Sequence, residues 1–508
     1  MAYADWKAPG EDSEFLIWPE PQDLIDQTRQ NHQHLSQNET LVGGLPLREL
    51  RTRQRQWLGH TDEQPLIASG HQTELYHAGV WVKDVLAEAV AGKIDGAAYH
   101  FAVDTDQPKH LQLKWMTVEG SAADAPHEVQ AFPVTDDPEL STASWAALLN
   151  APTPAHVATV SEALEKSRFT FQPLLADFLL SMRRLAIEAP DLANALTNAT
   201  HELNWSMGMR HHALLCSPMF SSEPYLAFVH HILSRCLSFA AHYNDALGEY
   251  RVEQKIKNAS RPMPDLHVTP TSIEVPFWLD DLTDGRRERA QVWRDGERLY
   301  FVAPGGEELP LRADAEGWDA AKQLGDFLKR NRLRLSPRAL TLTLFLRLLV
   351  VDNFIHGIGG GRYDQVTDRL IRSHFGIKPP KFAVTTATLY FPDALGRTRS
   401  CLPCVAREGH HLKHSILGPR KRELVTAIAE APRHSLSRRQ LFTQLHQELA
   451  EAAVNNPELS RWEEHLRQSQ QRSVEEQTLF DRELFFGVQP RERLIGLIEQ
   501  YASRFARG

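Results

Sequence analysis

The sequence predicts an α/β protein organised around a parallel sheet. Residues 65–110 contain a short apolar run, a turn at 69–72, a stretch with helical periodicity and a second β-rich run at 99–103. This order is typical of a βαβ unit. A second apolar segment, at 340–351, precedes a glycine-rich turn and another helical stretch. Because ligands gather at the carboxyl ends of parallel strands, we expect a site there.

The amino-acid composition limits the classes of protein to which this chain can belong. Of the 508 residues, 42% are apolar and 24% charged, as in ordinary globular proteins. This length predicts about two to four domains. The net charge of −9 argues against wholesale binding of nucleic acid. With four cysteines, no secretory leader and no long apolar span, we expect a cytoplasmic protein without a membrane partner.

Changes of periodicity divide the chain further. Prolines punctuate a helical stretch after residue 143, and Ser217-Pro218 precedes a long helix predicted over residues 225–250. Alternating β residues around the turn Asp295-Gly296 predict a small antiparallel element. We therefore expect the first half of the core at 1–142, a helical insertion at 143–205, a core helix segment at 206–262, a small antiparallel β insertion at 263–316, the second half of the core with its glycine-rich loop at 317–421, a helical coiled-coil arm at 422–480 and a C-terminal helix returning to the core at 481–508.

The first candidate cluster follows the first predicted strand. Gly70 permits a tight turn, and free N–H groups at the start of the next helix attract anions. His71 and Gln72 add polar groups, and Lys83 lies far enough into the helix to reach the same ligand. The alternatives are ordinary turn chemistry for the tripeptide and a solvated face for the lysine.

The second candidate cluster follows the second predicted strand. Asp104 and Asp106 suit a divalent metal, a pair of sugar hydroxyls or an amine. His110 is a candidate general base, or a surface histidine. We assign His71, Asp104, Asp106 and His110 as candidate catalytic residues and assign no metal ligands.

The third candidate cluster surrounds the glycine run at 357–361. The run resembles a phosphate-binding loop but lacks the lysine and hydroxyl residue of a P-loop and the spacing of a dinucleotide fingerprint. Neighbouring side chains supply charge and proton-transfer groups. The candidate substrate- or nucleotide-binding residues are Gly70, Gln72, Lys83, His356, Gly359, Gly360, Gly361, Arg362, Tyr363 and Asp364.

A cysteine pair close to several histidines invites a zinc interpretation. Cys401 and Cys404 precede His410, His411 and His414. The spacing fits no standard zinc module, and a redox Cys-x-x-Cys pair normally opens a helix after a strand. We leave zinc as the minor alternative and expect Cys216 and Cys236 in the core.

Set in chain order, these features resemble the cysteine-adding enzymes of bacillithiol biosynthesis. The resemblance covers nearly the whole chain and depends on the ordered set. Its residues are Gly70, His71, Gln72, Gly79 and Lys83; Asp104, Asp106 and His110; Ser217, Pro218 and Phe220; Gly248 and Tyr250; Arg286 and Arg289; Ser336 and Pro337; residues 357–361; Phe375, Gly376 and Ile377; and Pro490, Arg491, Glu492, Arg493 and Leu494.

The resemblance implies a Rossmann-like core of the nucleotidyltransferase type and a C-terminal coiled-coil arm that forms homodimers. It also implies an activity, the joining of the carboxyl group of cysteine to the amine of glucosaminyl malate. Three segments depart from the family: Gly-Gln-Gln-x-Gly-Leu is altered at 70–75, Gly-Glu-Asp-His-Asp at 103–107, and Gly-Gly-Pro-Gly-Glu at 357–362. We therefore expect a diverged member of the family with a different amine acceptor. Whether the amino-acid substrate is cysteine or another amino acid is left open.

Three functional hypotheses follow. The first is an amide-forming ligase that joins an amino acid to a small amine or amino sugar, with a nucleotide such as ATP as the candidate cofactor. The second is nucleotidyl or phosphoryl transfer to a sugar, which would consume ATP or CTP. The third is a non-catalytic scaffold that binds a metabolite and dimerises through residues 422–480.

Overall fold

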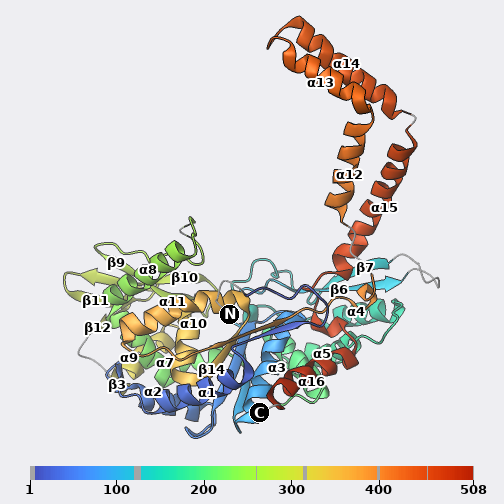
Figure 1. Cartoon of the computed structure of the whole chain (residues 1–508). Helices are drawn as coiled ribbons and strands as arrows, with labels where there is room; N and C mark the ends of the chain where they lie inside the picture. Colours follow the sequence, from blue (N-terminus) through green and yellow to red (C-terminus); the bar gives the residue numbers. More distant parts are fainter. Residues whose placement is uncertain are drawn as a thin grey trace. The chain divides into compact units, whose positions relative to one another are not determined.

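The computed structural model describes residues 6–118, 127–258, 260–312, 317–397, 401–454 and 456–506. The chain divides into two compact units, which Figure 1 colours by sequence. The larger unit contains Met1–Lys114, Ala131–Leu389 and Arg482–Gly508, and the smaller contains Trp115–Gln130 and Tyr390–Asp481.

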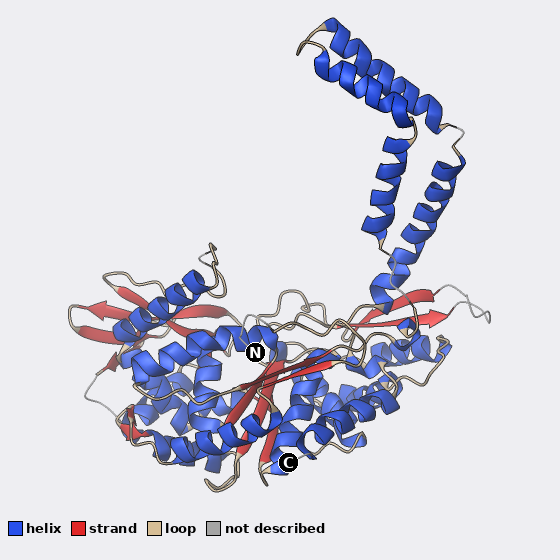
Figure 2. Cartoon of the chain, viewed as in Figure 1, coloured by secondary structure: helices blue, strands red, loops and turns tan. Residues whose placement is uncertain are grey.

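A six-stranded sheet forms the centre of the larger unit, with helices on both of its sides (Figure 2). Its order is β1-β15-β14-β4-β5-β8, in which β1 alone is antiparallel to its neighbour. The prediction of an α/β protein with a parallel sheet is confirmed. The strands are β1 (Phe15–Trp18), β4 (Leu66–Gln72), β5 (Ala97–Val103), β8 (His212–Leu215), β14 (Asn353–His356) and β15 (Ala383–Ala387).

The chain order reverses between β4 and β14. From β4 the chain passes through α3 (Ala78–Lys93) to β5 and then to β8, on one side of the sheet order. From β14 it passes through α11 (Ile358–Phe375) to β15, on the other side. The carboxyl ends of β4, β5 and β14 therefore meet at one edge, next to the point where open α/β sheets bind ligands.

Two groups of elements overlap the expected insertions, and the antiparallel one extends past the expected end at residue 316, because its sheet includes β13. The helical one contains η2 (Ala146–Leu148), α4 (Pro154–Lys166), α5 (Leu175–Glu188) and α6 (Leu192–Ser206). The antiparallel one is a five-stranded sheet of order β12-β11-β10-β9-β13, and its Asp295-Gly296 hairpin turn is confirmed by the pairing of Asp295 with Arg298. Its strands are β9 (Ser272–Asp281), β10 (Arg287–Asp295), β11 (Arg298–Val302), β12 (Glu308–Leu311) and β13 (Leu333–Pro337), with α9 (Trp318–Arg330) before β13.

The structure defines two segments, at 340–351 and 225–250, more closely than the sequence pattern did. The apolar segment before the glycine run is helical, as α10 (Ala339–Phe345) and the π-helical turn η4 (Leu346–Val350), and the strand follows it as β14. The long helix expected at 225–250 is two helices, α7 (Glu223–Ser234) and α8 (Cys236–Glu253), separated at Arg235. A short apolar run does not by itself distinguish a buried helix from a buried strand, so the sequence pattern alone did not decide the conformation of residues 340–351.

The remaining elements of the larger unit flank the sheet. The amino-terminal segment forms α1 (Pro21–Ser36), a small hairpin of β2 (Leu41–Val42) and β3 (Leu45–Pro46), and α2 (Leu47–Trp57). A one-turn helix η3 (Ser217–Ser221) follows β8, η6 (Phe486–Val488) precedes the last helix, and α16 (Arg491–Ala506) packs on α3 as a C-terminal helix returning to the core.

The smaller unit is mainly two pairs of helices, α12 (Leu402–Ser415) with α15 (Pro457–Leu479) and α13 (Gly418–Glu430) with α14 (Leu436–Ala453) (Figure 1). It also includes η5 (Pro392–Ala394), most of β6 (Gln112–Val118) and the start of β7 (His127–Pro133). The helical arm thus begins before the expected residue 422. Within the described residues, no helix combines the length and apolarity needed to cross a membrane.

A buried carboxylate holds β4 and β14 together at their amino ends. Asp352 accepts hydrogen bonds from Arg51, from Arg55 (3.1 Å) and from the backbone N–H of Leu66 (2.7 Å). Its own N–H donates to the carbonyl of Leu66 at 2.7 Å. Burial raises the pKa of Asp352, but the two arginines and His32 outweigh it and lower the pKa to about 2.

We predict that Asp352→Asn lowers the free energy of unfolding by about 3 to 5 kcal/mol, because two buried guanidinium groups lose their counter-charge. Urea unfolding at neutral pH measures the change. In the wild type the stabilisation persists above pH 3.8 and is lost as pH falls toward about 2, because the folded-state pKa is lowered. Glu39→Gln, which removes an exposed partner of Arg48, is the control and should cost less than about 1 kcal/mol.

Candidate functional site

The carboxyl end of β4 presents His71 and Gln72. The expected turn at residues 69–72 is wrong, because the strand continues through Gln72 in register with β5 and the helix begins only at Ala78. The N–H groups of Gly70, His71 and Gln72 thus belong to a strand and not to a helix start. A Cβ at Gly70 would lie 3.1 Å from the carbonyl oxygen of Phe101, so this glycine serves close strand packing.

Asp104 directly follows β5 and is fully buried. Its Oδ1 accepts the N–H of Ser217 at 2.9 Å, and within the described residues its Oδ2 is buried without a hydrogen-bond partner. Burial raises the pKa of this carboxyl group above its ordinary value, although the donors at Ser217 oppose the shift. A buried carboxylate oxygen without a partner is costly in a native protein and points to a functional role.

Polar contacts join the ends of β4 and β5. Gln72 Nε2 donates to Asp106 Oδ2 at 3.0 Å, and His71 Nδ1 lies 3.4 Å from Glu74 Oε1. Burial, and after it the charge of Lys83, lower the pKa of His71 well below its ordinary value. The imidazole is therefore neutral at pH 7 and available as a proton acceptor.

Lys83 lies under the end of β4, and its ammonium is buried. Nζ donates to the carbonyl of Gly70 at 2.7 Å. Burial lowers the pKa of Lys83 to about 8, although Asp84 and Glu74 oppose the shift. Lys83 is thus close to the candidate site, as expected. Its charged group is buried in the larger unit, so the alternative of a solvated lysine does not hold.

His110 contacts the residues that follow β4 through its backbone. Its N–H donates to Glu74 Oε2 at 3.2 Å, and its carbonyl accepts the N–H of Leu75 at 2.9 Å. The residue itself is exposed. The structure therefore gives His110 a role in holding the chain that follows Asp106 against the end of β4.

The end of β14 carries His356 beside β4, since Ile355 pairs with Ser69. His356 Nε2 lies 2.9 Å from Asp364 Oδ2, and Arg347 Nη1 donates to the same oxygen at 2.6 Å. Burial raises the pKa of Asp364, but Arg347 and His356 outweigh it and hold the pKa far below its ordinary value. Asp364 is thus an ionised counter-charge that orients His356.

The glycine run is the first turn of α11 and not a loop. Gly361 donates its N–H to the carbonyl of Gly357 at 3.0 Å, so the expectation that this group is free for a ligand is wrong. A Cβ at Gly361 would lie 2.5 Å from Val384, and one at Gly360 would lie 2.9 Å from His356 Nδ1. A Cβ at Gly359 would meet nothing within 4 Å, and the same holds at the N-cap Gly357, so Gly359 is the open glycine within the first turn of the helix.

Two other predicted residues point elsewhere. Arg362 donates to the carbonyl of Trp6 at 2.6 Å, and therefore holds the amino-terminal segment. Tyr363 is 40% exposed on the surface of α11. Among the described residues, neither side chain forms a hydrogen bond or ion pair with the ends of β4 or β5. The structure therefore brings together His71, Gln72, Asp104, Asp106 and Lys83, with His356 on the adjacent strand β14 and its partner Asp364 on α11.

Sequence reasoning missed a buried network directly below the end of β4. Tyr76 OH lies 2.9 Å from His100 Nε2, and His100 Nδ1 lies 2.9 Å from Asp84 Oδ1. Ser69 donates to the same carboxylate oxygen. The ring of Tyr76 contacts that of His71 edge to face, with centroids 5.4 Å apart. The network therefore fixes the ring of Tyr76, which lies beside the candidate base His71.

Sequence reasoning also missed Arg287 on β10. Its Nη1 donates to the carbonyl of Thr105 at 2.6 Å, and its Nε donates to Asp280 at 2.7 Å. Its guanidinium lies over the ring of Trp145, 4.9 Å from the centroid. Arg287 stands opposite Asp280 in the pairing of β9 with β10. Only a correct prediction of this strand register could have identified the residue from the sequence.

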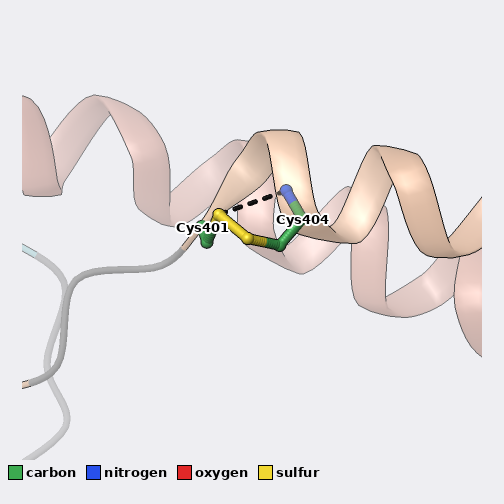
Figure 3. The surroundings of a disulfide bond; sticks show 2 residues. All are labelled: Cys401 and Cys404. Carbon is green, nitrogen blue, oxygen red and sulfur yellow. Dashed lines mark hydrogen bonds between the residues drawn. A yellow bond between two sulfur atoms is a disulfide. The ribbon is translucent and has the colours of Figure 1, made fainter.

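The cysteine and histidine residues after residue 400 do not form a zinc site among the described residues. Cys401 and Cys404 are joined by a disulfide (Figure 3), and no group of three or more His, Cys, Asp or Glu side chains that could hold a metal was found in the described part of the chain. The side chain of His414 lies outside the described part. Cys216 and Cys236 are buried thiols, as predicted.

Comparison with known proteins does not assign the chain to a family. No family model and no curated protein sequence matches the chain. The argument for function therefore depends on the geometry at the ends of β4, β5 and β14.

We predict that Asp104→Asn gains stability relative to the wild type as pH rises from about 4 to about 8. The raised pKa means that ionising Asp104 is unfavourable in the folded state, so the wild type alone loses stability as pH rises through that pKa. Urea unfolding of both proteins across this range measures the difference.

Asp137→Asn is the control of opposite sign. Burial raises the pKa of Asp137, but donors at Asn150 and Glu139 outweigh it and lower the pKa below its ordinary value of 3.8. This variant should therefore lose stability relative to the wild type as pH rises toward that value, and the difference should change little above about pH 5. A difference for Asp104→Asn that stays constant with pH would contradict the assignment of a raised pKa.

Proposed function

We propose that the protein is an amide-forming ligase that joins an amino acid to the amine of a small molecule or amino sugar. The observation that carries the proposal is a carboxylate oxygen of Asp104, which is buried at the end of β5 without a hydrogen-bond partner among the described residues. Two residues farther along the chain, Asp106 accepts a hydrogen bond from Gln72. Carboxylates at this position can orient an amine or sugar hydroxyls by accepting their hydrogen bonds. The Rossmann-like fold and the relationship to the cysteine-adding enzymes are part of the same proposal.

The strand order supports the Rossmann-like part. Counting only parallel strands in chain order, the sheet runs third, second, first, fourth, fifth, as β8, β5, β4, β14, β15. This is the order of dinucleotide-binding sheets, which bind ligands where the order reverses. Gly359, the open position in the first turn of α11, offers room there for an anionic or phosphorylated group.

Amide formation requires a neutral amine, an acceptor for its proton and compensation of charge on the acyl group. Asp104 and Asp106 would hold the amine, and His71, neutral at pH 7, would take the proton as the nitrogen attacks. His71 is better suited than the exposed His110, because Tyr76 and Glu74 fix its ring. Lys83 and Arg287 place positive charge behind the same strand ends.

A nucleotide such as ATP would supply the activation of the carboxyl group when bound. Nucleotidyl or phosphoryl transfer to a sugar is the second candidate function, and the open N-terminus of α11 favours it. The two reactions differ in product, because only the ligase forms an amide between an amino acid and an amine.

We predict that Asp104→Asn and Asp106→Asn each lower amide formation by at least about 100-fold, because the amine loses a carboxylate that orients it. The assay incubates the protein with amino acids, ATP and amino-sugar acceptors and follows pyrophosphate and product mass. The melting temperature of Asp106→Asn should change little, and that of Asp104→Asn should not fall below the wild-type value.

Asp284→Asn, at an exposed residue that pairs with Arg286, is the matched control and should keep full activity. Pyrophosphate release without any amide product would favour nucleotidyl transfer. Complete absence of turnover by the wild type would favour a metabolite-binding scaffold.

We also propose that the protein forms a homodimer through the helical arm. Apolar contacts between α13 and α14 involve Leu424, Ile428 and Leu445, and other large apolar side chains on the same helices stay exposed in the single chain. Large apolar side chains that stay exposed on the pair α13 and α14 favour a protein partner. They are Val425, Leu436 and Phe442, with Val454 just after α14.

We predict that the double variant Leu436→Glu, Phe442→Glu, and a chain without residues 422–480, are monomers in light scattering coupled to size exclusion, whereas the wild type is a dimer. Gln440→Glu, an exposed polar position on the same helix, should leave the dimer intact. A dimer that persists in both disrupted proteins would place the contact elsewhere.

A further inference from the structure

We propose that Cys401 and Cys404 form a reversible thiol–disulfide exchange site that reacts with thiols and disulfides of small molecules. The proposal rests on the smaller unit alone and is independent of the proposed ligase activity. The observation behind it is a disulfide between two exposed cysteines at the start of α12. Nothing in the candidate site uses these two residues.

The pair lies where an incoming sulfur atom can reach it. Both cysteines are exposed, whereas Cys216 and Cys236 are buried. Exchange requires that a thiolate approach one sulfur along the sulfur–sulfur bond, so access decides which cysteines react. The chain thus separates two reactive cysteines from two protected ones.

The helix distinguishes the two sulfur atoms. Cys401 is the N-cap of α12, and its Sγ accepts the N–H of Cys404 at 3.2 Å (Figure 3). The same N–H would donate to a Cys401 thiolate after reduction. A helix N-terminus favours a thiolate, and the first turn of α12 contains no acidic side chain that would oppose it. Cys401 is therefore the nucleophile, and Cys404 is the resolving cysteine.

A structural role explains the pair less well. The two cysteines are three residues apart, and a cross-link that closes so short a loop restrains the unfolded chain least. The helix is held by other contacts: Trp462 Nε1 donates to the carbonyl of Val405 at 2.7 Å, and the Trp462 ring fills the space beside Gly409. Reduction should therefore leave α12 packed on α15.

The exchange balances in two steps. In the reduced protein the Cys401 thiolate attacks a disulfide of two small thiols, forms a mixed disulfide with one and releases the other as a thiolate, which takes up a proton. The Cys404 thiolate then attacks Sγ of Cys401, forms the protein disulfide and releases the second small thiol. The protein loses two electrons and two protons, and the small disulfide gains them. The reverse sequence reduces the protein.

Glutathione and its disulfide serve as the probe for the full-length protein. After equilibration in buffers of varied redox potential, free thiols are alkylated and counted by intact mass and peptide mapping. We expect Cys401 and Cys404 to change together in one reversible two-electron transition, while Cys216 and Cys236 stay unlabelled. We expect the melting temperatures of the reduced and oxidised proteins to differ by no more than about 5 °C.

Two single variants test the assignment of roles. Cys404→Ser should form the mixed disulfide with glutathione at Cys401 at least about tenfold faster than Cys401→Ser forms it at Cys404, because only Cys401 receives the N–H of residue 404. Circular dichroism verifies that both variants fold.

Four results would overturn the proposal. They are a disulfide that millimolar glutathione does not reduce, equal rates for the two single variants, a loss of more than about 10 °C in melting temperature on reduction, and one tightly bound zinc ion per chain in the reduced protein. The last result would make the pair a metal site.

Discussion

The arrangement of the larger unit depends on the buried charge of Asp352. This residue bonds to Leu66 through both its side chain and its backbone, so the first residues of β4 and β14 are held side by side. Because strands in register stay in register along their length, the same contact places Gly70 and His356 next to each other at the far end. Arg51 and Arg55 neutralise the charge, and because both lie on α2 they attach this helix to the sheet.

Buried carboxylates of the larger unit differ in how fully they are compensated, and this difference separates structural from candidate functional groups. Asp352 and Asp364 each accept hydrogen bonds from arginine, and their pKa values are lowered. Asp104 is buried with one oxygen unpartnered among the described residues, and its pKa is raised. Buried aspartates in one unit therefore differ in the direction of their pKa shifts, since a low-dielectric interior penalises a carboxylate that lacks a counter-charge.

Periodicity and turn residues were enough to predict the parallel sheet, the helical insertion and the hairpin at Asp295-Gly296, because these features depend on residues close in sequence. The same local signals failed at Gly361. A glycine run after an apolar segment is typical of a phosphate-binding loop, yet Gly361 is small because Val384 and Trp6 press against it. Arg287 was missed for the same reason, since its partner Thr105 is far away in the chain.

The sequence by itself determined which residues are polar at the strand ends, including His71, Gln72, Asp104 and Asp106, and that both strands belong to one parallel sheet. Tertiary structure decided how they are paired. Gln72 donates a hydrogen bond to Asp106, and His110 contributes its backbone while the residue stays exposed. One oxygen of Asp104 has no hydrogen-bond partner in the described part of the chain. The physical reason is that burial and pairing set the charge state of a side chain, and both are properties of its neighbours in space.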